Sequence, residues 1–183
     1  MPKIIAKKED WIKLGYKRFS EKGISGIVIE KMAKSLSVNK SSFYWHFSTK
    51  KAFIRSIIHF WETESTSKII STVKLEAHPK ARFDKLIEVS FLKDNEIDFF
   101  FYLKKYAKTN KELAIKMEKL DKDRIQFIAE ILETMGYSTS DSKVKSSIFY
   151  KYLIGYHEMI RYKEQGPDYI TKVKNELNHF IKY

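Results

Sequence analysis

The sequence predicts an all-α protein in which an N-terminal three-helix head is joined by a fourth helix to a larger helical body. Three observations lead to this fold class. Apolar residues make up 43% of the 183 residues and recur at helical spacing, so a core can be buried. Residues of high helix propensity, among them Lys, Glu, Leu and Ala, are common. Only three prolines and six glycines are present, too few for a turn-rich β protein.

The head is predicted from three short amphipathic segments. Residues 8–22 form the first helix, which Gly23 ends. Residues 27–36 form the second helix. Asn39 is a suitable N-cap for the third, residues 40–46. The buried faces of the three helices are predicted to carry Trp11, Ile12, Gly15, Tyr16 and Phe19; Ile29, Met32, Ala33 and Leu36; and Phe43 and Phe47.

A long fourth helix connects the head to the body. It is predicted to run over residues 49–75 with Ser48 as its N-cap, and His78-Pro79 then breaks the chain. The body helices are predicted at about 80–93, 95–107, 110–135, 140–164 and 168–182. The domain organisation is therefore a head at 1–48, a connecting helix at 49–75 and a body at 76–183.

Several classes of protein are excluded by composition. The chain has no cysteine, which rules out a disulfide scaffold, a Cys-ligated zinc site and a thiol nucleophile. The N-terminus has no apolar segment of signal-peptide length, and no run reaches the ~18 apolar residues of a membrane span. We therefore expect a cytoplasmic protein that has no membrane partner and needs no cofactor.

Positive charge is concentrated at the start of the chain. The formal net charge is +12, of which residues 1–53 hold +8, with twelve Lys/Arg against four Asp/Glu. Such a distribution indicates that the head binds a polyanion. The alternative is that the lysines only keep the protein soluble, as in organisms whose proteins are generally rich in lysine.

Residues 25–47 meet the requirements of a helix-turn-helix. Two short helices joined by a tight turn can place the second helix in the DNA major groove. A small residue is needed where the helices cross, and an apolar residue must follow the turn. Ala33 and Val38 satisfy these needs. The second helix is short and polar on its outer side, as a groove-facing helix must be.

Three stretches of the head resemble the N-terminal domain of TetR-family repressors. They are Phe19-Ser-Glu-Lys-Gly23, Met32-Ala33 and Val38-Asn-Lys-Ser-Ser-Phe-Tyr-Trp-His-Phe-Ser-Thr-Lys50. The resemblance covers roughly residues 8–55. It implies a homodimeric repressor that binds double-stranded DNA at a palindromic operator and is released by a small apolar or aromatic effector.

The resemblance also implies roles for single residues of the recognition helix, 40–46. Lys40, Ser41 and Ser42 would lie close to base edges and phosphates, and Lys40 could donate to guanine N7 and O6. Tyr44 would reach a phosphate or a thymine methyl group, while Trp45 and His46 would flank the backbone. Lys50 would hold a phosphate at the start of the fourth helix. The alternative is that these side chains are ordinary surface residues with no role in DNA binding.

The head departs from the family pattern at residues 27–29, at Ser37 and, without consequence in a helix, at Ser41, where the family often has Gly. Residues 27–29 read Ile-Val-Ile, where the family usually has a Thr or Ser that caps the second helix, so Ser25 is a substitute cap. Ser37 stands where the family usually has Gly. If this position needs a positive φ, serine costs about 1 kcal/mol there.

The body is rich in aromatic residues, and the resemblance places an effector site among them. The candidates are Trp61, Phe99, Phe100, Tyr102, Tyr106, Phe127, Phe149, Tyr152, Tyr156 and His157. The alternative for each is a place in the core. Helices 140–164 and 168–182 carry more apolar residues than one core face needs, which predicts a four-helix dimer interface.

Two other functions remain open. A non-specific nucleic-acid or architectural protein would use the same lysines without reading bases. An enzyme is the second alternative. His157-Glu158 begins like the zinc motif His-Glu-x-x-His, but Arg161 occupies the place of the second His, and the five histidines show no metal-ligand spacing.

Overall fold

The computed structural model describes residues 6–93, 96–161 and 163–182. Within these ranges the chain is helical and contains no strand, so the predicted all-α fold class is confirmed. The helices of the head and its connection are α1 (Lys8–Lys22), α2 (Ile29–Ser35), α3 (Lys40–His46), α4 (Lys50–Glu62) and α5 (Lys68–Lys74). Those of the body are α6 (Pro79–Phe91), α7 (Glu96–Ala107), α8 (Lys111–Thr134), α9 (Thr139–Ile160) and α10 (Tyr169–Leu177). None of the described helices is long and apolar enough to cross a membrane.

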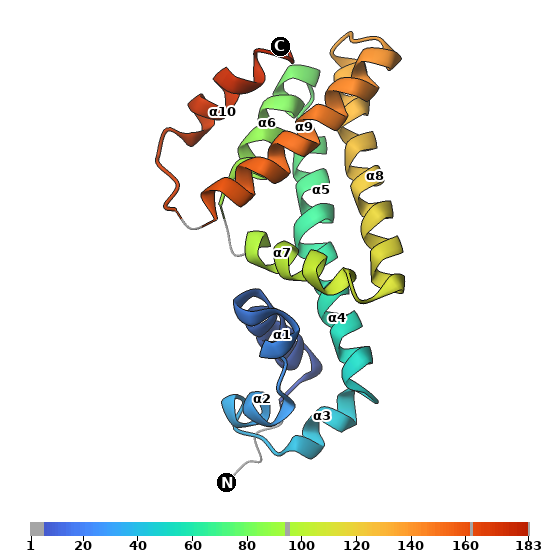
Figure 1. Cartoon of the computed structure of the whole chain (residues 1–183), viewed down its shortest axis with the longest axis vertical. Helices are drawn as coiled ribbons and strands as arrows, with labels where there is room; N and C mark the ends of the chain where they lie inside the picture. Colours follow the sequence, from blue (N-terminus) through green and yellow to red (C-terminus); the bar gives the residue numbers. More distant parts are fainter. Residues whose placement is uncertain (1–5, 94–95, 162, 183) are drawn as a thin grey trace.

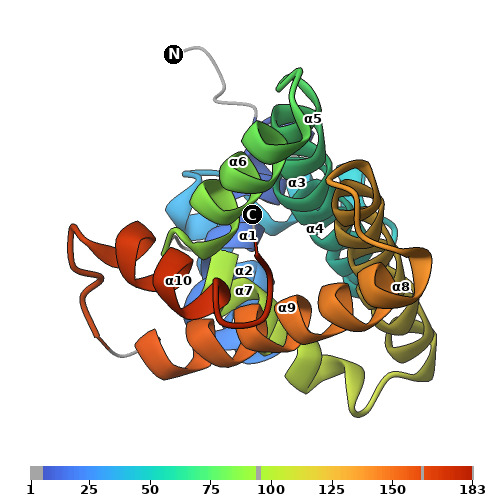
Figure 2. The ribbon, with the colours of Figure 1, turned by 90° about the horizontal axis from the view of Figure 1, so that it is seen from above.

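The molecule is elongated, with the helix-turn-helix at one end (Figure 1). Helices α1, α2 and α3 form that end, and α4 leads away from it into the body. Helix α7 lies across the middle, between the head and the other body helices. Seen from above, α8, α9 and α10 follow one another around the body, and α5 and α6 close the remaining side (Figure 2).

Two hydrophobic clusters hold the chain together. The first, the head cluster, contains Trp11, Phe19 and Phe43 of the head and Phe53 and Trp61 of α4. The same cluster includes Phe99 and Leu103 of α7 and Leu113 and Met117 of α8, all almost fully buried. The second cluster joins α5, α6, α8, α9 and α10. Helix α7 and the start of α8 therefore pack on the head although they follow α6 in sequence.

The long connecting helix is interrupted. The prediction of one helix over 49–75 is wrong in detail, because a π-helical turn, Thr63–Ser67, separates α4 from α5. The N-cap of α4 is Thr49 rather than Ser48, since the Thr49 hydroxyl accepts a hydrogen bond from the Ala52 amide at 3.1 Å. A π turn adds a residue to the helical repeat and commonly marks a functional position.

Other helix ends differ from the predicted ones for local reasons. Helix α2 begins at Ile29 because Ile27 is fully buried and Val28 is extended. Helix α9 ends at Ile160, where the Lys93 ammonium donates to the carbonyls of Ile160 and Arg161 at 3.2 and 3.1 Å. Since those carbonyls lie at the helix end, they no longer need partners within the helix. Helix α10 ends at Leu177 rather than at residue 182.

Close helix packing in the head depends on Gly15. A Cβ atom at Gly15 would lie 2.6 Å from both Ile57 and Phe53 of α4, closer than carbon atoms can approach. The glycine thus lets α1 and α4 meet, which fixes the direction in which α4 leaves the head.

Candidate nucleic-acid interface and internal cavity

The helix-turn-helix is anchored from within by aromatic residues. Phe43 is fully buried, and its ring meets Trp11 of α1 edge-on at 5.3 Å and Phe53 of α4 at 5.1 Å. Ala33 is buried at the crossing of α2 and α3, and its carbonyl accepts a hydrogen bond from the Val38 amide at 3.0 Å. These contacts fix the orientation of α3 relative to α1 and α4.

The turn between α2 and α3 contains a strained residue. Ser37 has φ of 57°, and no other non-glycine residue in the described part of the chain has a positive φ. The position therefore does need the left-handed conformation that favours glycine, which costs a side-chain-bearing residue about 1–2 kcal/mol.

The predicted DNA-contacting residues mostly lie on one exposed surface. Lys40, Ser41, Tyr44 and Trp45 are exposed along the outer side of α3, and Lys50 is exposed at the first residue of α4. Trp45 is 80% exposed, and Tyr44 is 55% exposed. So large an exposed apolar area on a seven-residue helix is unusual unless something covers it. Ser42 lies at the edge of this surface and is half-buried.

His46 points in a different direction from the rest. Its Nε2 donates to the carbonyl of Ala6, 40 residues earlier, at 2.8 Å, and its ring is half-buried. The histidine ties the segment before α1 to the end of α3. A direct phosphate contact by this ring would require the bond to open.

Lys40 has an ion-pair partner that the sequence did not reveal. Its ammonium lies 2.9 Å from the carboxylate of Glu30 in α2, and both side chains are exposed. The hydrogen bond and the charge of each partner raise the pKa of Lys40 and lower that of Glu30. Ten residues separate the two, so only the fold brings them together. Lys40 must exchange this partner to reach a base.

Ser25 does not cap α2. Its hydroxyl donates to the Lys22 carbonyl at 2.7 Å, and the N-cap residue of α2, Val28, has no side chain able to cap. The expected substitute cap is thus wrong. At α4, by contrast, Thr49 caps one amide, and Lys50 stands beside the remaining amides of the first turn, a favourable place for an anion.

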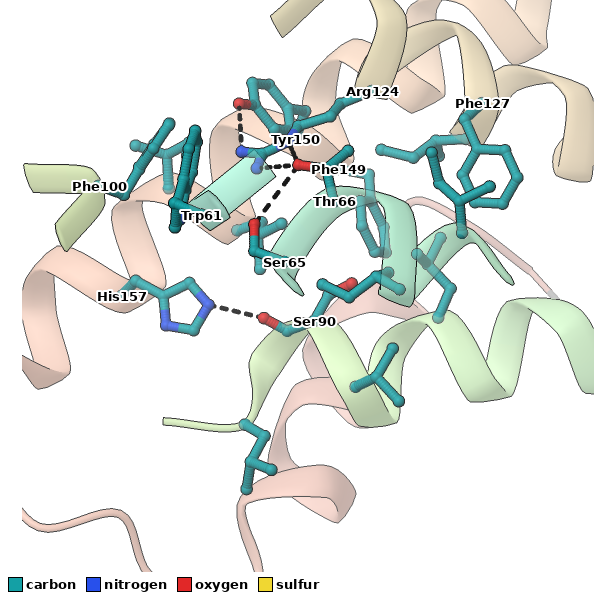
Figure 3. Close-up of a pocket in the computed structure, with 18 of the residues that line it drawn as sticks. Trp61, Ser65, Thr66, Ser90, Phe100, Arg124, Phe127, Phe149, Tyr150 and His157 are labelled. Atoms are coloured by element: carbon teal, nitrogen blue, oxygen red, sulfur yellow. Dashed lines mark hydrogen bonds between the residues drawn. The ribbon is translucent and has the colours of Figure 1, made fainter. Parts of the chain in front are cut away.

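The body contains a cavity of about 200 Å³ between α4, the π turn and helices α5 to α9 (Figure 3). Most of its wall is apolar, and a polar cluster lies at one side. The apolar wall is formed chiefly by Trp61, Ile69, Leu86, Phe100, Phe127, Phe149 and Leu153. The polar lining residues are Ser65, Thr66, Lys104, Arg124, Tyr150, His157 and Glu158.

Five of the ten predicted effector residues line this cavity: Trp61, Phe100, Phe127, Phe149 and His157. The other five lie elsewhere. Phe99 and Tyr106 pack on the head cluster, and Tyr102 lies against Gly23, where a Cβ atom would come within 2.7 Å of its ring. The rings of Tyr152 and Tyr156 pack on Phe91 at 5.5 and 5.2 Å, outside the cavity.

Arg124 organises the polar cluster, and sequence reasoning missed it. Its Nη2 donates to the Thr66 hydroxyl at 2.6 Å, and its Nη1 lies 3.4 Å from the Tyr150 hydroxyl. Tyr150 in turn donates to Asp121 at 2.5 Å. Burial, first of all, raises the pKa of Tyr150, so the hydroxyl stays protonated at neutral pH. In the sequence Arg124 stands in a charged run that reads as a solvated helix face.

The guanidinium of Arg124 also covers aromatic faces. It lies 5.1 Å from the centre of the Phe100 ring and 5.6 Å from that of Trp61. The Lys104 ammonium lies 4.7 Å from the Phe100 ring. Two cations and two rings thus form one side of the cavity.

His157, at another part of the wall, and Arg161, just after α9, both have structural partners. His157 Nε2 donates to the Ser90 carbonyl at 2.6 Å. Arg161 forms an ion pair with Asp98 at 3.2 Å and lies 3.3 Å above the Phe101 ring. Both residues of the incomplete His-Glu-x-x-His motif therefore join α9 to neighbouring elements.

Comparison with known proteins agrees with this geometry. Residues 12–57 match the family described as bacterial regulatory proteins, tetR family. The uncharacterized HTH-type transcriptional regulator YuxN of Bacillus subtilis (strain 168) is 22% identical over 80 residues, 44% of this chain. The match spans only 28% of that relative's length.

Two solved structures share the fold over nearly the whole chain. One, described as a transcriptional regulator from Saccharomonospora viridis in complex with choline, has a TM-score of 0.81 at 14% identity, covering 96% of this chain and 95% of its own. The other, a transcriptional regulator of the TerR/AcrR family from Aquifex aeolicus VF5, has a TM-score of 0.70 at 24% identity, covering 95% and 99%.

The fold and the surface of α3 define the class of the protein: an all-α helix-turn-helix protein with a cavity of about 200 Å³ in its body. The match of residues 12–57 confirms the resemblance seen in the sequence. The N-terminal part of the chain is similar to the tetR family of bacterial regulatory proteins, and the chain as a whole has the fold of solved transcriptional regulators.

Proposed function

We propose that the protein is a sequence-specific DNA-binding repressor that acts as a homodimer and leaves its operator when a small molecule fills the body cavity. The observation that carries this proposal is the outer side of α3. Exposed Lys40, Ser41, Tyr44 and Trp45 lie on a helix whose inner side is fixed by Phe43. The first 53 residues also carry a net charge of +8.

The residues of this surface suit two kinds of DNA contact. Lys40 and Ser41, at the N-terminal end of α3, are placed for base edges, which specify sequence. Tyr44 and Trp45 offer a hydroxyl, an indole N–H and apolar area to the backbone and to thymine methyl groups. Lys50 and the amides at the start of α4 suit a phosphate, which positions the protein without reading sequence.

An apolar stripe on α9 supports dimerisation. Val144, Ile148 and Met159 are exposed at helical spacing, Met159 by 73%. Gly155 lies on the same stripe, and a Cβ atom there would meet nothing within 4 Å. A glycine within a helix destabilises the folded protein by about 0.5–1 kcal/mol relative to alanine. No neighbouring atom of the described chain requires a glycine at position 155. Close approach of a partner helix gives it a purpose.

Helix α10 contributes less to such an interface than its sequence suggested. Its apolar residues Val173 and Leu177 are fully buried in the protein's own core. We therefore assign the proposed interface mainly to α9. Two copies related by twofold symmetry would present two α3 helices to one DNA, about 34–36 Å apart if they read successive major grooves.

Helix α4 supports coupling between cavity and DNA. It begins beside α3, and its residue Trp61 belongs to the head cluster while lining the cavity. The π turn that follows α4 supplies Ser65 and Thr66 to the cavity wall. A ligand that favours another position of α4 would change the spacing of the two α3 helices and lower DNA affinity by its differential binding to the two states.

Selection of binding sites from random duplex DNA at near-physiological salt tests the proposal. We expect an inverted repeat with half-sites about one helical turn apart. Tyr44→Ala should abolish the enrichment. Leu75→Ala serves as control, because Leu75 is 85% exposed at the far end of α5 and its removal leaves the head unchanged.

The outcome also separates the alternatives. If no sequence is enriched and binding disappears steeply as salt rises, the protein is a non-specific nucleic-acid binder. If Leu75→Ala loses DNA binding as Tyr44→Ala does, both variants have lost binding because they no longer fold correctly. Circular dichroism of both variants detects that case directly.

A further inference from the structure

The polar side of the cavity is rich in donors and poor in available acceptors. Arg124 donates to Thr66 and lies near the Tyr150 hydroxyl, both of which are neutral groups. No carboxylate of the described residues lies within ion-pair distance of Arg124. Asp121, which is hydrogen-bonded to this cluster, accepts from Tyr150 and lies 3.8 Å from the Lys104 ammonium, so it is already engaged.

Further donors lie beside Arg124. The indole N–H of Trp61 is buried and has no acceptor among the residues that the structure describes. The hydroxyls of Ser65 and Thr66 face each other at 3.5 Å, and Ser65 is almost fully buried. Figure 3 shows these groups on the same side of the cavity. A buried donor without an acceptor costs about 1–3 kcal/mol, so a ligand that brings acceptors gains that amount.

The aromatic rings of this side do not suit a cationic ligand. A quaternary ammonium group binds to open aromatic faces. Here Arg124 lies over both Trp61 and Phe100, and Lys104 lies over Phe100 as well. A second cation would meet two positive charges at the rings that it needs.

Most of the rest of the wall is apolar, and the space is small. Ile69, Leu86, Phe127, Phe149 and Leu153 offer no polar side-chain atom. The volume of about 200 Å³ is below the 300–1,000 Å³ typical of drug-sized ligands. Glu158, which also lines the cavity, lies 3.8 Å from Arg161 and is largely exposed.

We propose that the cavity takes a small amphiphilic carboxylate, whose acid group binds Arg124 and whose apolar tail lies among Ile69, Phe127 and Phe149. The planar guanidinium can donate two parallel hydrogen bonds to one carboxylate, a geometry that a neutral hydroxyl cannot match. This inference rests on the proposed function, of which it names the effector class.

The same exchange gives the ligand a route to α4. In the structure the Arg124–Thr66 bond ties α8 to the π turn at the end of α4. A carboxylate that takes the guanidinium frees the Thr66 hydroxyl, which can then donate to the ligand. The tie between α8 and the π turn is replaced by a bond through the ligand.

Calorimetry with three probes of equal tail length tests the inference on the full chain. The probes are octanoate, 1-octanol and octyltrimethylammonium, and 4-butylbenzoate extends the series to an aromatic carboxylate. We expect at least one carboxylate to bind about tenfold or more tightly than the alcohol, because a charge-assisted bidentate bond is the stronger one. The ammonium should bind weakest.

Two variants of α8 complete the test. Arg124→Gln should bring the carboxylate affinity down to that of the alcohol, whereas Lys122→Gln, an exposed neighbour on α8, should change nothing. Arg124→Lys keeps the positive charge but loses the two parallel donors of the guanidinium, so its carboxylate affinity should lie between those of the native protein and of Arg124→Gln. The inference is overturned if no carboxylate binds, if alcohol or ammonium binds as tightly, or if Arg124→Gln retains the preference.

DNA binding is measured in a separate arm. Operator selection that succeeds while carboxylate preference fails overturns the ligand class and leaves the regulator intact. Carboxylate preference without any sequence-specific DNA binding overturns the proposed function and leaves the ligand class of the cavity intact. Release of the selected DNA by octanoate from the native protein, but not from Arg124→Gln, would support both.

Discussion

Replacing Ser37 by glycine should stabilise the protein. Ser37 holds φ of 57° in the turn before α3, and no hydrogen bond of its side chain is found among the described residues. Its amide donates to the Lys34 carbonyl at 3.1 Å, a bond that glycine keeps. The substitution therefore removes strain and sacrifices no contact of the folded state.

The size of the effect follows from two opposing contributions. Relief of the left-handed conformation yields about 1–2 kcal/mol. The greater freedom of glycine in the unfolded chain costs about 0.4–1 kcal/mol. We expect a net gain of about 0.5–1 kcal/mol, which corresponds to a rise of about 1–4 °C in Tm for a chain of this size.

Urea unfolding followed by circular dichroism measures this gain, with Ser35→Gly as the matched control. Ser35 is the last residue of α2, and its hydroxyl donates to the Lys31 carbonyl at 3.0 Å. Glycine there should destabilise the protein by about 0.5–1 kcal/mol, so the two variants have opposite signs. A loss of stability in both would refute the assignment of strain to Ser37.

Three further predictions concern the interface, the dimer and the cavity. Glu30→Gln frees Lys40 and should tighten operator binding up to about fivefold in a filter-binding assay, whereas Glu21→Gln, which removes the same charge from α1, should have less effect. Ile148→Glu should convert a dimer to monomers in sedimentation velocity, and a dimer that persists would exclude the α9 stripe. Because burial raises the pKa of Tyr150, stability should fall as pH rises above about 10, where an unfolded tyrosine ionises, and Tyr150→Phe should fall less steeply.

The head could be predicted from the sequence because its signals are local. The bounds of α1 and α3 agree with the predicted 8–22 and 40–46, since apolar spacing and the terminating Gly23 lie within a few residues of each helix. The need for a positive φ at residue 37 was likewise a local inference. The exposed surface of α3 followed from the same short segment.

The cavity could not be predicted in this way because its parts are far apart in the chain. Arg124, Thr66 and Tyr150 come from three elements, and only their packing brings them together. Aromatic residues alone gave no means of separating cavity from core: Phe99 and Phe100 are neighbours, yet one packs on the head and the other lines the cavity. The π turn likewise gives no pattern in the hydrophobic spacing of residues 49–75.

The packing of α7 on the head limits how the protein can be divided. Phe99, Leu103, Leu113 and Met117 complete a core whose other members lie before residue 62. A fragment that ends at residue 48 or 75 lacks these four side chains, so the apolar residues of the head that pack against them would be exposed to water. An isolated head is therefore expected to aggregate. For the same reason a chimera that grafts this head onto a relative's body must carry α7 and the first turns of α8 with it. The unit that can be exchanged between regulators of this fold is thus discontinuous in sequence.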